Sequence, residues 1–291
     1  MNRAGVARLT STGGLDSGFD PAWGASTVYV KSVAFLGDGR IVTGGSSSSF
    51  GYLSRRNPDG TREMAWMSET GTDGDVYSLI RQADGKVLLG GSFTHANGAA
   101  RTNLVRLNAD GSLDTNFTAS TSNSRDWIPA LAVQADGKLL VGGSFTSLGG
   151  VNRTNLARLN VDGSLDAGFV ADLSPPGDAE IDAICVQPDG KILVGGWFES
   201  INGAAVTNLA RLNPDGSLDA TFKTGAGPDD YVFALAVQAD GMILLGGYFY
   251  QINGITQPHL ARLGPDGQVD PSFNTAPSSL SDLGRRFLGK I

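Results

Sequence analysis

An all-β protein built from repeated antiparallel sheets is indicated by three features of this 291-residue chain. Two sequence phrases recur in a fixed order, and each phrase places short apolar runs on both sides of an Asp-Gly turn. No segment sustains the 3.6-residue apolar period of a helix, apart from a turn or two expected within 280–291. The 41 glycines show no period of three, so they favour tight turns over a collagen-like chain.

The repeats are about 50 residues long. The first phrase, ALAVQADGKLLVGGSF at 130–145, has further copies at 32–47, 78–93, 183–198 and 234–249. The second phrase, NLARLNVDGSLDAGF at 155–169, follows every copy of the first, and an additional copy opens the chain at 6–19. The Asp of the first phrase recurs every 46 to 53 residues. This period predicts an array in which each repeat is one supersecondary unit.

Each repeat is expected to form four short strands joined by Asp-Gly hairpins. Pro and Asp suit a type I turn, and the Gly that follows suits a left-handed position, which together give a three-residue hairpin loop. This register places a basic residue opposite an acidic one in every second phrase, where the pair has a structural role. The predicted pairs are Arg8–Asp16, Arg55–Glu63, Arg106–Asp114, Arg158–Asp166, Arg211–Asp219 and Arg262–Asp270.

The first strand of each repeat has a small face and a larger face. In the third complete repeat, Ala130 and Ala132 lie on one face, and Leu131 and Val133 lie on the other. Since a solvated face would carry polar residues, both faces are expected to be covered. The Gly-Gly pair of the second strand extends the small face, so that a neighbouring sheet can approach closely. Four-stranded sheets stacked in this way around an axis predict a β-propeller.

The phrases DGKxLVGGSF and NLARLNxDGSLDxxF resemble the delta-60 repeat β-propeller family of bacterial multi-repeat proteins. The resemblance covers residues 3–275 and implies the propeller fold, and it implies no catalytic activity. It also implies an exported bacterial protein.

The expected organisation is one propeller over residues 1–275, followed by a tail at 276–291. A half-unit at 3–19 precedes repeats at 28–68, 75–119, 127–171, 180–224 and 231–275. We expect five full blades and a partial sixth. A five-bladed ring with a surplus hairpin and a fragment of a longer array are the other interpretations, and the sequence does not decide whether a ring closes.

Ligand-binding residues are expected on the face opposite the Asp-Gly turns, where the longer and more varied loops lie. Aromatic, basic and polar residues there suit stacking on sugar rings and bonding to their hydroxyl groups, although the aromatic residues are also suited to filling gaps between blades. The candidates are His95, Arg101, Trp127, Arg153, Tyr231 and Tyr250, with Trp197 and His259 in the same loops.

Acidic residues stand just before the first strand of four repeats, at Asp75, Asp126, Glu180 and Asp230. Such carboxylates could bind calcium, which takes six to eight oxygen ligands, but solvated surface charge explains them more simply. No other cofactor is expected. Cys185 replaces an alanine of the first strand and is expected to be a packed thiol. Motifs for phosphate-binding loops, serine hydrolases and zinc peptidases are absent from the sequence.

A non-enzymatic protein that binds a protein or a glycan is the favoured function. The alternatives are a polysaccharide lyase or hydrolase, with its acids at a channel mouth, and a purely structural module of a larger surface protein. The net charge of −7 disfavours nucleic acid as a partner, and no apolar run spans a bilayer. The composition and the resemblance favour an extracellular or cell-surface location, although the chain starts without a signal-peptide core. The oligomeric state is left open.

Overall fold

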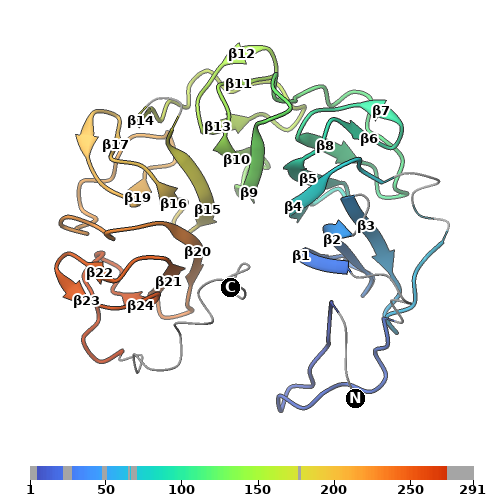
Figure 1. Cartoon of the computed structure of the whole chain (residues 1–291), viewed down its shortest axis with the longest axis horizontal. Coiled ribbons are helices and arrows are strands. Elements are labelled where there is room, and N and C mark those ends of the chain that lie inside the picture. Colours follow the sequence, from blue (N-terminus) through green and yellow to red (C-terminus); the bar gives the residue numbers. More distant parts are fainter. Residues whose placement is uncertain are drawn as a thin grey trace. The chain divides into compact units, whose positions relative to one another are not determined.

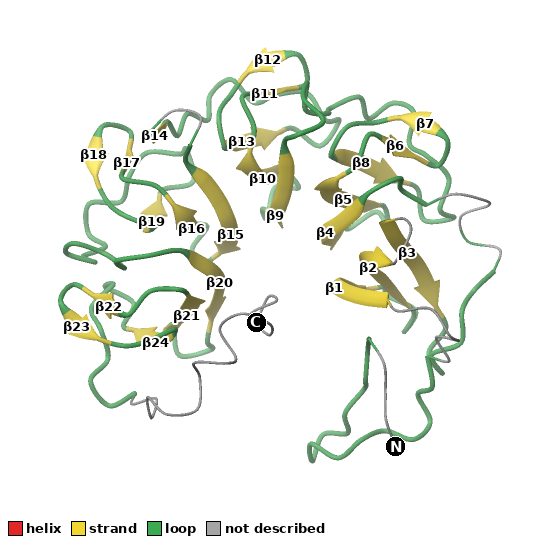
Figure 2. Ribbon diagram, viewed as in Figure 1, coloured by secondary structure: helices red, strands yellow, loops and turns green. Residues whose placement is uncertain are grey.

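The computed structural model describes residues 5–21, 28–47, 51–64, 66, 71–175 and 178–273. Within these ranges the chain forms strands, turns and loops (Figure 2), and no helix there is long and apolar enough to cross a membrane. Two compact units, Met1–Trp127 and Ile128–Ile291, are described separately below as unit 1 and unit 2. The predicted tail at 276–291 lies outside the described residues.

Five sheets share one strand order (Figure 1). The two strands of the first phrase pair with each other, and the second of them pairs with a strand of the second phrase. The sheets of unit 1 are β1 (Val28–Phe35), β2 (Ile41–Ser47) and β3 (Gly51–Arg56), then β4 (Asp75–Arg81), β5 (Val87–Ser92) and β8 (Leu104–Leu107). Those of unit 2 are β9 (Trp127–Val133, beginning at the boundary), β10 (Leu139–Ser144) and β13 (Leu156–Leu159), β15 (Glu180–Val186), β16 (Ile192–Trp197) and β19 (Leu209–Leu212), and β20 (Val232–Val237), β21 (Ile243–Gly247) and β24 (Leu260–Leu263).

The predicted fourth strand is reduced to a single bridge in every one of these sheets. For example, Leu212 of β19 bridges to Leu218, and no further ladder follows among the described residues. In this sheet the ladder ends because of Asp219, whose Oδ1 accepts a hydrogen bond from the backbone N–H of Thr221 at 3.0 Å. This side chain starts a turn and directs the backbone away from the sheet after one pair.

The loops opposite the Asp-Gly turns contain small hairpins that the sequence analysis did not predict. Asn97-Gly98, Asn202-Gly203 and Asn253-Gly254 all have positive φ, as a type I′ turn requires. These hairpins pair β6 (His95–Ala96) with β7 (Ala99–Ala100), β11 (Ser147–Leu148) with β12 (Val151–Asn152), β17 (Ser200–Ile201) with β18 (Ala204–Ala205), and β22 (Gln251–Ile252) with β23 (Ile255–Thr256). A further strand, β14 (Leu173–Ser174), pairs with β17.

The six predicted pairs of a basic and an acidic side chain are confirmed. Arg211 Nε donates to Asp219 Oδ2 at 2.7 Å, and the guanidinium lies 4.5 Å from the ring centre of Phe222. The lysine of the first phrase adds a second cation that was not expected, because Lys191 Nζ lies 2.8 Å from the same Asp219 oxygen. The arginine also reaches the next repeat, where Arg211 Nη1 donates to the carbonyl of Pro265. Each pair therefore joins the two strands of its hairpin, and the arginines Arg8, Arg55, Arg158 and Arg211 also bond to the following repeat.

The two glycines of each Gly-Gly pair have different roles. A Cβ on Gly142 would lie 2.6 Å from Ile181 Cγ2 of the next sheet, so this glycine permits the predicted close approach between sheets. A Cβ on Gly196 would instead lie 2.1 Å from the carbonyl oxygen of Glu180 in its own sheet. The second glycine is therefore required by a β-bulge in the first strand, and not by the neighbouring sheet.

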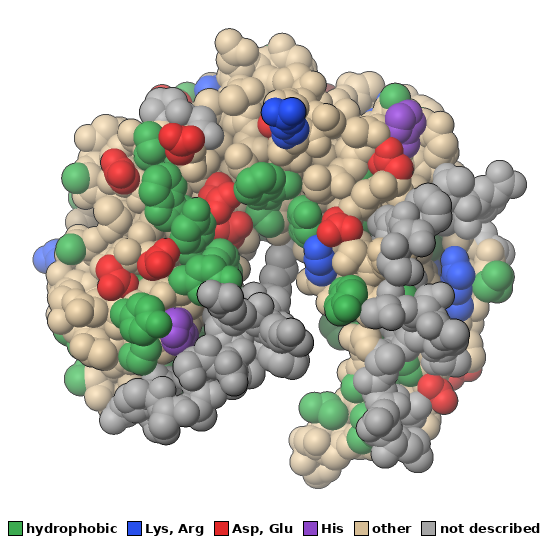
Figure 3. Space-filling model, viewed as in Figure 1, with side chains coloured by type: hydrophobic (Ala, Val, Ile, Leu, Met, Phe, Trp, Pro, Cys, Tyr) green, Lys and Arg blue, Asp and Glu red, His purple; other side chains and the backbone are tan. Residues whose placement is uncertain are grey.

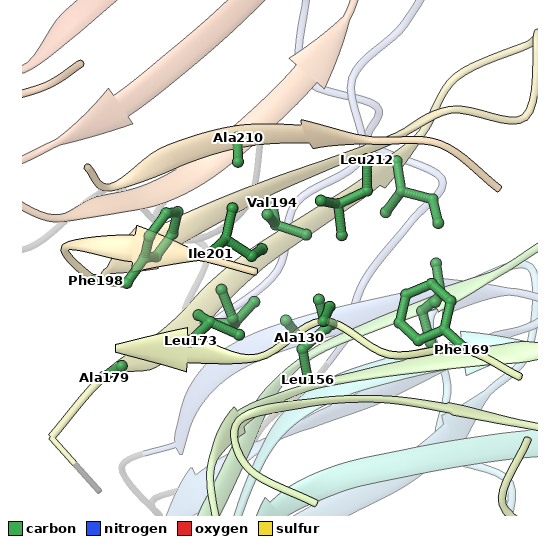
Figure 4. Close-up of a cluster of buried hydrophobic side chains, with 14 of the residues drawn as sticks. Ala130, Leu156, Phe169, Leu173, Ala179, Val194, Phe198, Ile201, Ala210 and Leu212 are labelled. Atoms are coloured by element: carbon green, nitrogen blue, oxygen red, sulfur yellow. The ribbon is translucent and has the colours of Figure 1, made fainter. Parts of the chain in front are cut away.

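The core of unit 2 lies between its sheets. Small residues such as Ala130 and Ala132 of β9 pack with Ile181 of β15 in one buried cluster, as the alternation of small and larger positions predicts. Phe169 and Phe198 lie at opposite ends of the same cluster, and both are fully buried (Figure 4). Such packing covers both faces of β15, which fixes the position of any side chain on that strand.

Candidate functional site

The candidate ligand residues of unit 1 are held by local contacts. His95 begins β6, and its Nδ1 lies 3.1 Å from Asp73 Oδ2. Burial would raise the pKa of Asp73, but hydrogen bonds from Thr94 and His95 outweigh burial and lower it to about 2. Arg101 Nη1 donates to the carbonyl of Ala100 at 2.8 Å. His95 therefore has a structural partner, and a ligand role for His95 and Arg101 stays a prediction.

Tyr231 of unit 2 belongs to a surface group of four aromatic side chains, called the aromatic cluster below. The rings of Trp197 and Tyr231 stack at 6.1 Å, and Tyr231 stacks on Phe233 at 5.6 Å. Tyr248 meets Phe233 edge-on at 4.5 Å. The cluster joins the ends of β16 and β21 to the start of β20, and hydrophobic and acidic side chains gather together on this face (Figure 3).

The other candidates of unit 2 and its border lie apart from the aromatic cluster in the contacts that the structure shows. Tyr250 packs edge-on against His259 at 4.8 Å. Arg153 follows β12, where its backbone N–H donates to the carbonyl of Thr146. Trp127 is the exposed first residue of β9. Of the predicted residues, Tyr231 and Trp197 are therefore brought together in the aromatic cluster, and Tyr250 and His259 form a separate pair.

Asp182 is a half-buried acidic residue that the sequence analysis missed. It is the extra residue of the bulge in β15, where the register shifts between Ile181 and Ala183. With Phe233 it lines a cavity of about 120 Å³, and its Oδ2 is buried without a hydrogen-bond partner among the described residues. Burial, and then the charge of Glu180, raise the pKa of Asp182 to about 8. This carboxyl group is therefore mostly protonated at neutral pH and can donate a hydrogen bond.

The four acids proposed for calcium do not occupy one repeated position. Asp75 and Glu180 begin β4 and β15, whereas Asp126 and Asp230 each stand one residue earlier relative to the strand that follows. Since successive side chains of a strand point to opposite faces, this offset separates the two pairs. Asp75 forms a 2.7 Å ion pair with Lys31. Within the described part of the chain, no three His, Cys, Asp or Glu side chains are grouped closely enough to hold a metal ion, and the calcium site stays a prediction.

A groove of about 460 Å³ lies in unit 2 on the face where ligand binding was predicted. It is lined by Trp197 at the end of β16, by Glu199 after this strand, and by Asp229 and Gln251 from two other loops. Thr207, which stands before β19, also lines the groove. The groove therefore combines one indole ring with two carboxyl groups, an amide and a hydroxyl group. Trp197 also belongs to the aromatic cluster, so the two features are continuous.

Asparagine and aspartate side chains hold the walls of this groove. Asn208 has a φ of 60°, and its amide accepts from the backbone N–H of Phe198 and donates to the carbonyl of Pro228, each at 3.0 Å. Asp229 Oδ1 accepts from the backbone N–H groups of Tyr250 and Gln251 at 2.8 and 3.0 Å. These bonds tie the loop after β16 to the connection before β20, so the groove exists before a ligand binds.

Alignment by strand register would have revealed Asp182. Its bulge position is occupied by Lys31, Tyr77 and Phe233 in three other sheets, so an acid there departs from the pattern. The groove had no comparable signal, because its residues come from three separate loops. Cys185 is half-buried, and burial raises the pKa of its thiol, as expected for a packed side chain.

Four segments of the chain match the family model described as "Domain of unknown function (DUF5122) beta-propeller": residues 82–117, 134–169, 187–222 and 238–273. These four segments are similar to DUF5122 β-propeller repeats. Each match runs from the Asp-Gly turn of the first phrase to the phenylalanine that ends the second phrase. A comparison with curated protein sequences gave no match.

Solved structures with the same arrangement of sheets share little sequence with this chain. The WD40 domain of Neurospora crassa Pan2 matches with a TM-score of 0.54 and 14% identity, over 92% of this chain and 70% of that one. Virginiamycin B lyase from Staphylococcus aureus gives 0.52 and 13%, over 83% and 68%. A gluconolactonase from Xanthomonas campestris gives 0.50 and 15%, over 84% and 76%. With the DUF5122 matches, these similarities show that the fold is an all-β propeller.

Proposed function

We propose that this chain is a glycan-binding β-propeller of the delta-60 repeat type, and that it belongs to an exported or cell-surface bacterial protein. The groove between β16 and β20 is the proposed binding site. Trp197 is the platform on which one sugar ring stacks. Glu199, Asp229 and Gln251 accept and donate hydrogen bonds at the sugar hydroxyl groups.

The composition of the groove supports this proposal. A volume of about 460 Å³ lies within the range of small-molecule sites, which combine an apolar surface with a few polar groups. A sugar offers both an apolar ring face and hydroxyl groups that donate and accept hydrogen bonds. Two carboxyl groups in one groove favour a neutral or amino sugar over a uronic acid, whose negative charge they would repel.

The proposal is tested with neutral and acidic oligosaccharides, using cellohexaose, chitohexaose, xylohexaose and oligogalacturonate in isothermal titration calorimetry. At least one neutral or amino oligosaccharide is expected to bind saturably. Trp197→Ala should weaken that binding at least tenfold, since stacking is lost, and the exposed Glu199→Gln should weaken it severalfold. Trp127→Ala, which removes an indole outside the groove, should leave the affinity unchanged. Binding that survives Trp197→Ala would refute this site.

A polysaccharide-cleaving enzyme is the second candidate, and Asp182 is the observation that favours it. A carboxyl group with a pKa of about 8 is protonated at neutral pH and can act as a general acid, with Glu180 as the neighbouring carboxylate. The release of reducing ends or of unsaturated products from the same glycans would support an enzyme, provided that Asp182→Asn abolishes it. Binding without product release favours the binding protein, and the absence of both favours a structural module.

A further inference from the structure

Unit 1 holds a lysine ammonium group between the first strands of two successive sheets. Lys31 and Tyr77 are the extra residues of the bulges in β1 and β4. Lys31 Nζ lies 4.4 Å from the ring centre of Tyr77 and 2.7 Å from Asp75 Oδ2. An aromatic ring face attracts a cation, and a carboxylate forms a charge-assisted hydrogen bond with it. The bulge positions of two successive sheets can therefore bind an ammonium group.

The same positions in unit 2 carry a carboxyl group and aromatic rings in place of the lysine and its partners. The bulge residues of β15 and β20, which belong to successive sheets as β1 and β4 do, are Asp182 and Phe233. Tyr231 stands where β4 has Asp75, and its ring stacks on Phe233 at 5.6 Å. No lysine or arginine among the described residues offsets the effect of burial on the pKa of Asp182 or Glu180. Unit 2 therefore has the acceptor groups for an ammonium ion, and its described part supplies no cation to them.

The cavity beside Asp182 gives a ligand room. Asp182 and Phe233 line this volume of about 120 Å³, and its other walls are apolar residues of β9, β15 and β20 such as Ala130 and Ala234. The Oδ2 atom of Asp182 is buried there without a hydrogen-bond partner among the described residues, and an unpaired buried oxygen destabilises the fold. The cavity shares no lining residue with the groove of the proposed glycan site, so this inference does not rest on the proposed function.

The charges around the aromatic rings favour a cation. Burial, and then the charges of Glu180, Asp182 and Asp230, raise the pKa of Tyr231. Three carboxyl groups therefore act on one ring of the aromatic cluster, on the face where acidic and hydrophobic side chains adjoin (Figure 3). Such a group of acids attracts cations and repels anions.

We propose that unit 2 binds an alkylammonium group between Asp182 and the rings of Phe233 and Tyr231. The ammonium group forms an ion pair with the carboxylate of Asp182 and lies against an aromatic ring face, as Lys31 does in unit 1. The alkyl chain contacts the apolar walls of the cavity. The ligand is a primary amine with a short apolar chain, which is either a free amine or the lysine side chain of a peptide.

Binding of the cation is coupled to release of a proton. Asp182, with a pKa of about 8, is mostly protonated at neutral pH, whereas an alkylammonium group stays charged up to about pH 10. The titratable groups near Asp182 are Glu180 on its own strand and Asp230 and Tyr231 before β20. The strands β9, β10 and β16 carry no titratable side chain. The affinity is therefore expected to rise with pH until Asp182 is ionised before the ligand binds.

The test uses the full chain and butylammonium chloride in isothermal titration calorimetry, with 1-butanol as an uncharged probe of similar size. Butylammonium is expected to bind saturably at millimolar concentrations, whereas 1-butanol is not. The affinity for butylammonium should rise roughly tenfold between pH 6 and pH 7 and change less than about twofold above pH 8. Acetyl-lysine methylamide, which carries the same group on a peptide, distinguishes the two sources. Tighter binding than that of butylammonium indicates a peptide lysine, and weaker binding indicates a free amine.

Two variants at pH 8 test the named groups. Asp182→Asn should weaken butylammonium binding at least tenfold and remove its pH dependence, and a thermal scan checks that this variant is folded. Phe233→Leu should weaken binding severalfold, because the ring face is lost. The matched control is Asp172→Asn, which removes an exposed carboxyl group of the same unit and should bind butylammonium normally. Absence of saturable binding, equal binding by Asp182→Asn, or an affinity that does not change with pH would overturn the proposal.

Discussion

Replacing Gly142 by alanine adds one methyl group at the contact between β10 and β15. The added Cβ would lie 2.6 Å from Ile181 Cγ2 and 2.9 Å from Ile184 Cδ1. Carbon atoms in ordinary contact are about 3.5–4.0 Å apart. Relief therefore requires a shift of nearly 1 Å in one of two packed sheets or a strained isoleucine rotamer. Overpacking of this kind costs about 1–3 kcal/mol.

A compensating term reduces this cost, because alanine restricts the unfolded chain by about 0.4–1 kcal/mol relative to glycine at a compatible φ. The expected net loss of unfolding free energy is therefore roughly 1–2 kcal/mol. For a unit of this size, each kcal/mol lowers the melting temperature by about 2–4 °C. Urea unfolding followed by circular dichroism, together with a thermal scan, measures both quantities.

Two further variants separate overpacking from a general effect of the methyl group. A Cβ on Gly14 of the opening hairpin would meet only Thr10 Oγ1 at 3.4 Å, so Gly14→Ala should leave stability unchanged or slightly raised. Ile184→Val removes the Cδ1 atom, and in the double variant it should recover part of the loss caused by Gly142→Ala. A Gly142→Ala protein as stable as the wild type would refute close packing between these sheets.

Three other predictions concern buried groups. Asp182→Asn should stabilise the protein increasingly as the pH rises from about 4 to about 8. The unfolded carboxyl group ionises near 3.8, whereas the folded one stays protonated up to about 8. Urea unfolding at pH 4, 6, 8 and 9 measures this gain, and a gain that does not change with pH contradicts the raised pKa. Asp219→Ala should lower the free energy of unfolding by about 3–5 kcal/mol in urea, because it leaves the buried Arg211 without its carboxylate. Lys191→Met should lower it by less than about 1 kcal/mol, because this lysine is partly exposed. Equal losses of stability in the two variants would show that the ion pair of Arg211 with Asp219 does not stabilise the fold more than that of Lys191 does. Ala132→Phe should overpack the contact between β9 and β15 and lower the free energy of unfolding by roughly 1–3 kcal/mol or more. An unchanged melting temperature would count against that contact.

Local features of the fold were predictable from the sequence. Asp-Gly turns determine the hairpin register, and so the pairing of Arg211 with Asp219 followed from counting residues. The fourth strand was overestimated because Asp219 has a second role: the oxygen that does not bind Arg211 starts a turn. The Asn-Gly hairpins were missed even though Asn202-Gly203 is a standard signal for a two-residue loop.

The candidate site was predictable in position more than in residues. The sequence predicted binding residues on the face with the variable loops, and the structure has a groove of about 460 Å³ there, but binding at this face stays a prediction. The partners of Tyr231 depend on which loops meet in space, and a linear sequence does not show that Trp197 stacks on it. Asp182 was overlooked because a β-bulge shifts the strand register by one residue, and simple alternation assigns the wrong face after such a shift.

The indole N–H signal of Trp197 provides the most direct test of the proposed glycan site. The chain has four tryptophans, so its indole region in a ¹⁵N–¹H NMR spectrum contains four signals, and Trp197→Phe identifies the relevant one. Titration with the oligosaccharide that binds in calorimetry should shift the Trp197 signal saturably, with the same affinity, and leave the other three nearly unmoved. A Trp197 signal that stays in place while the sugar binds would show that the groove is not the binding site.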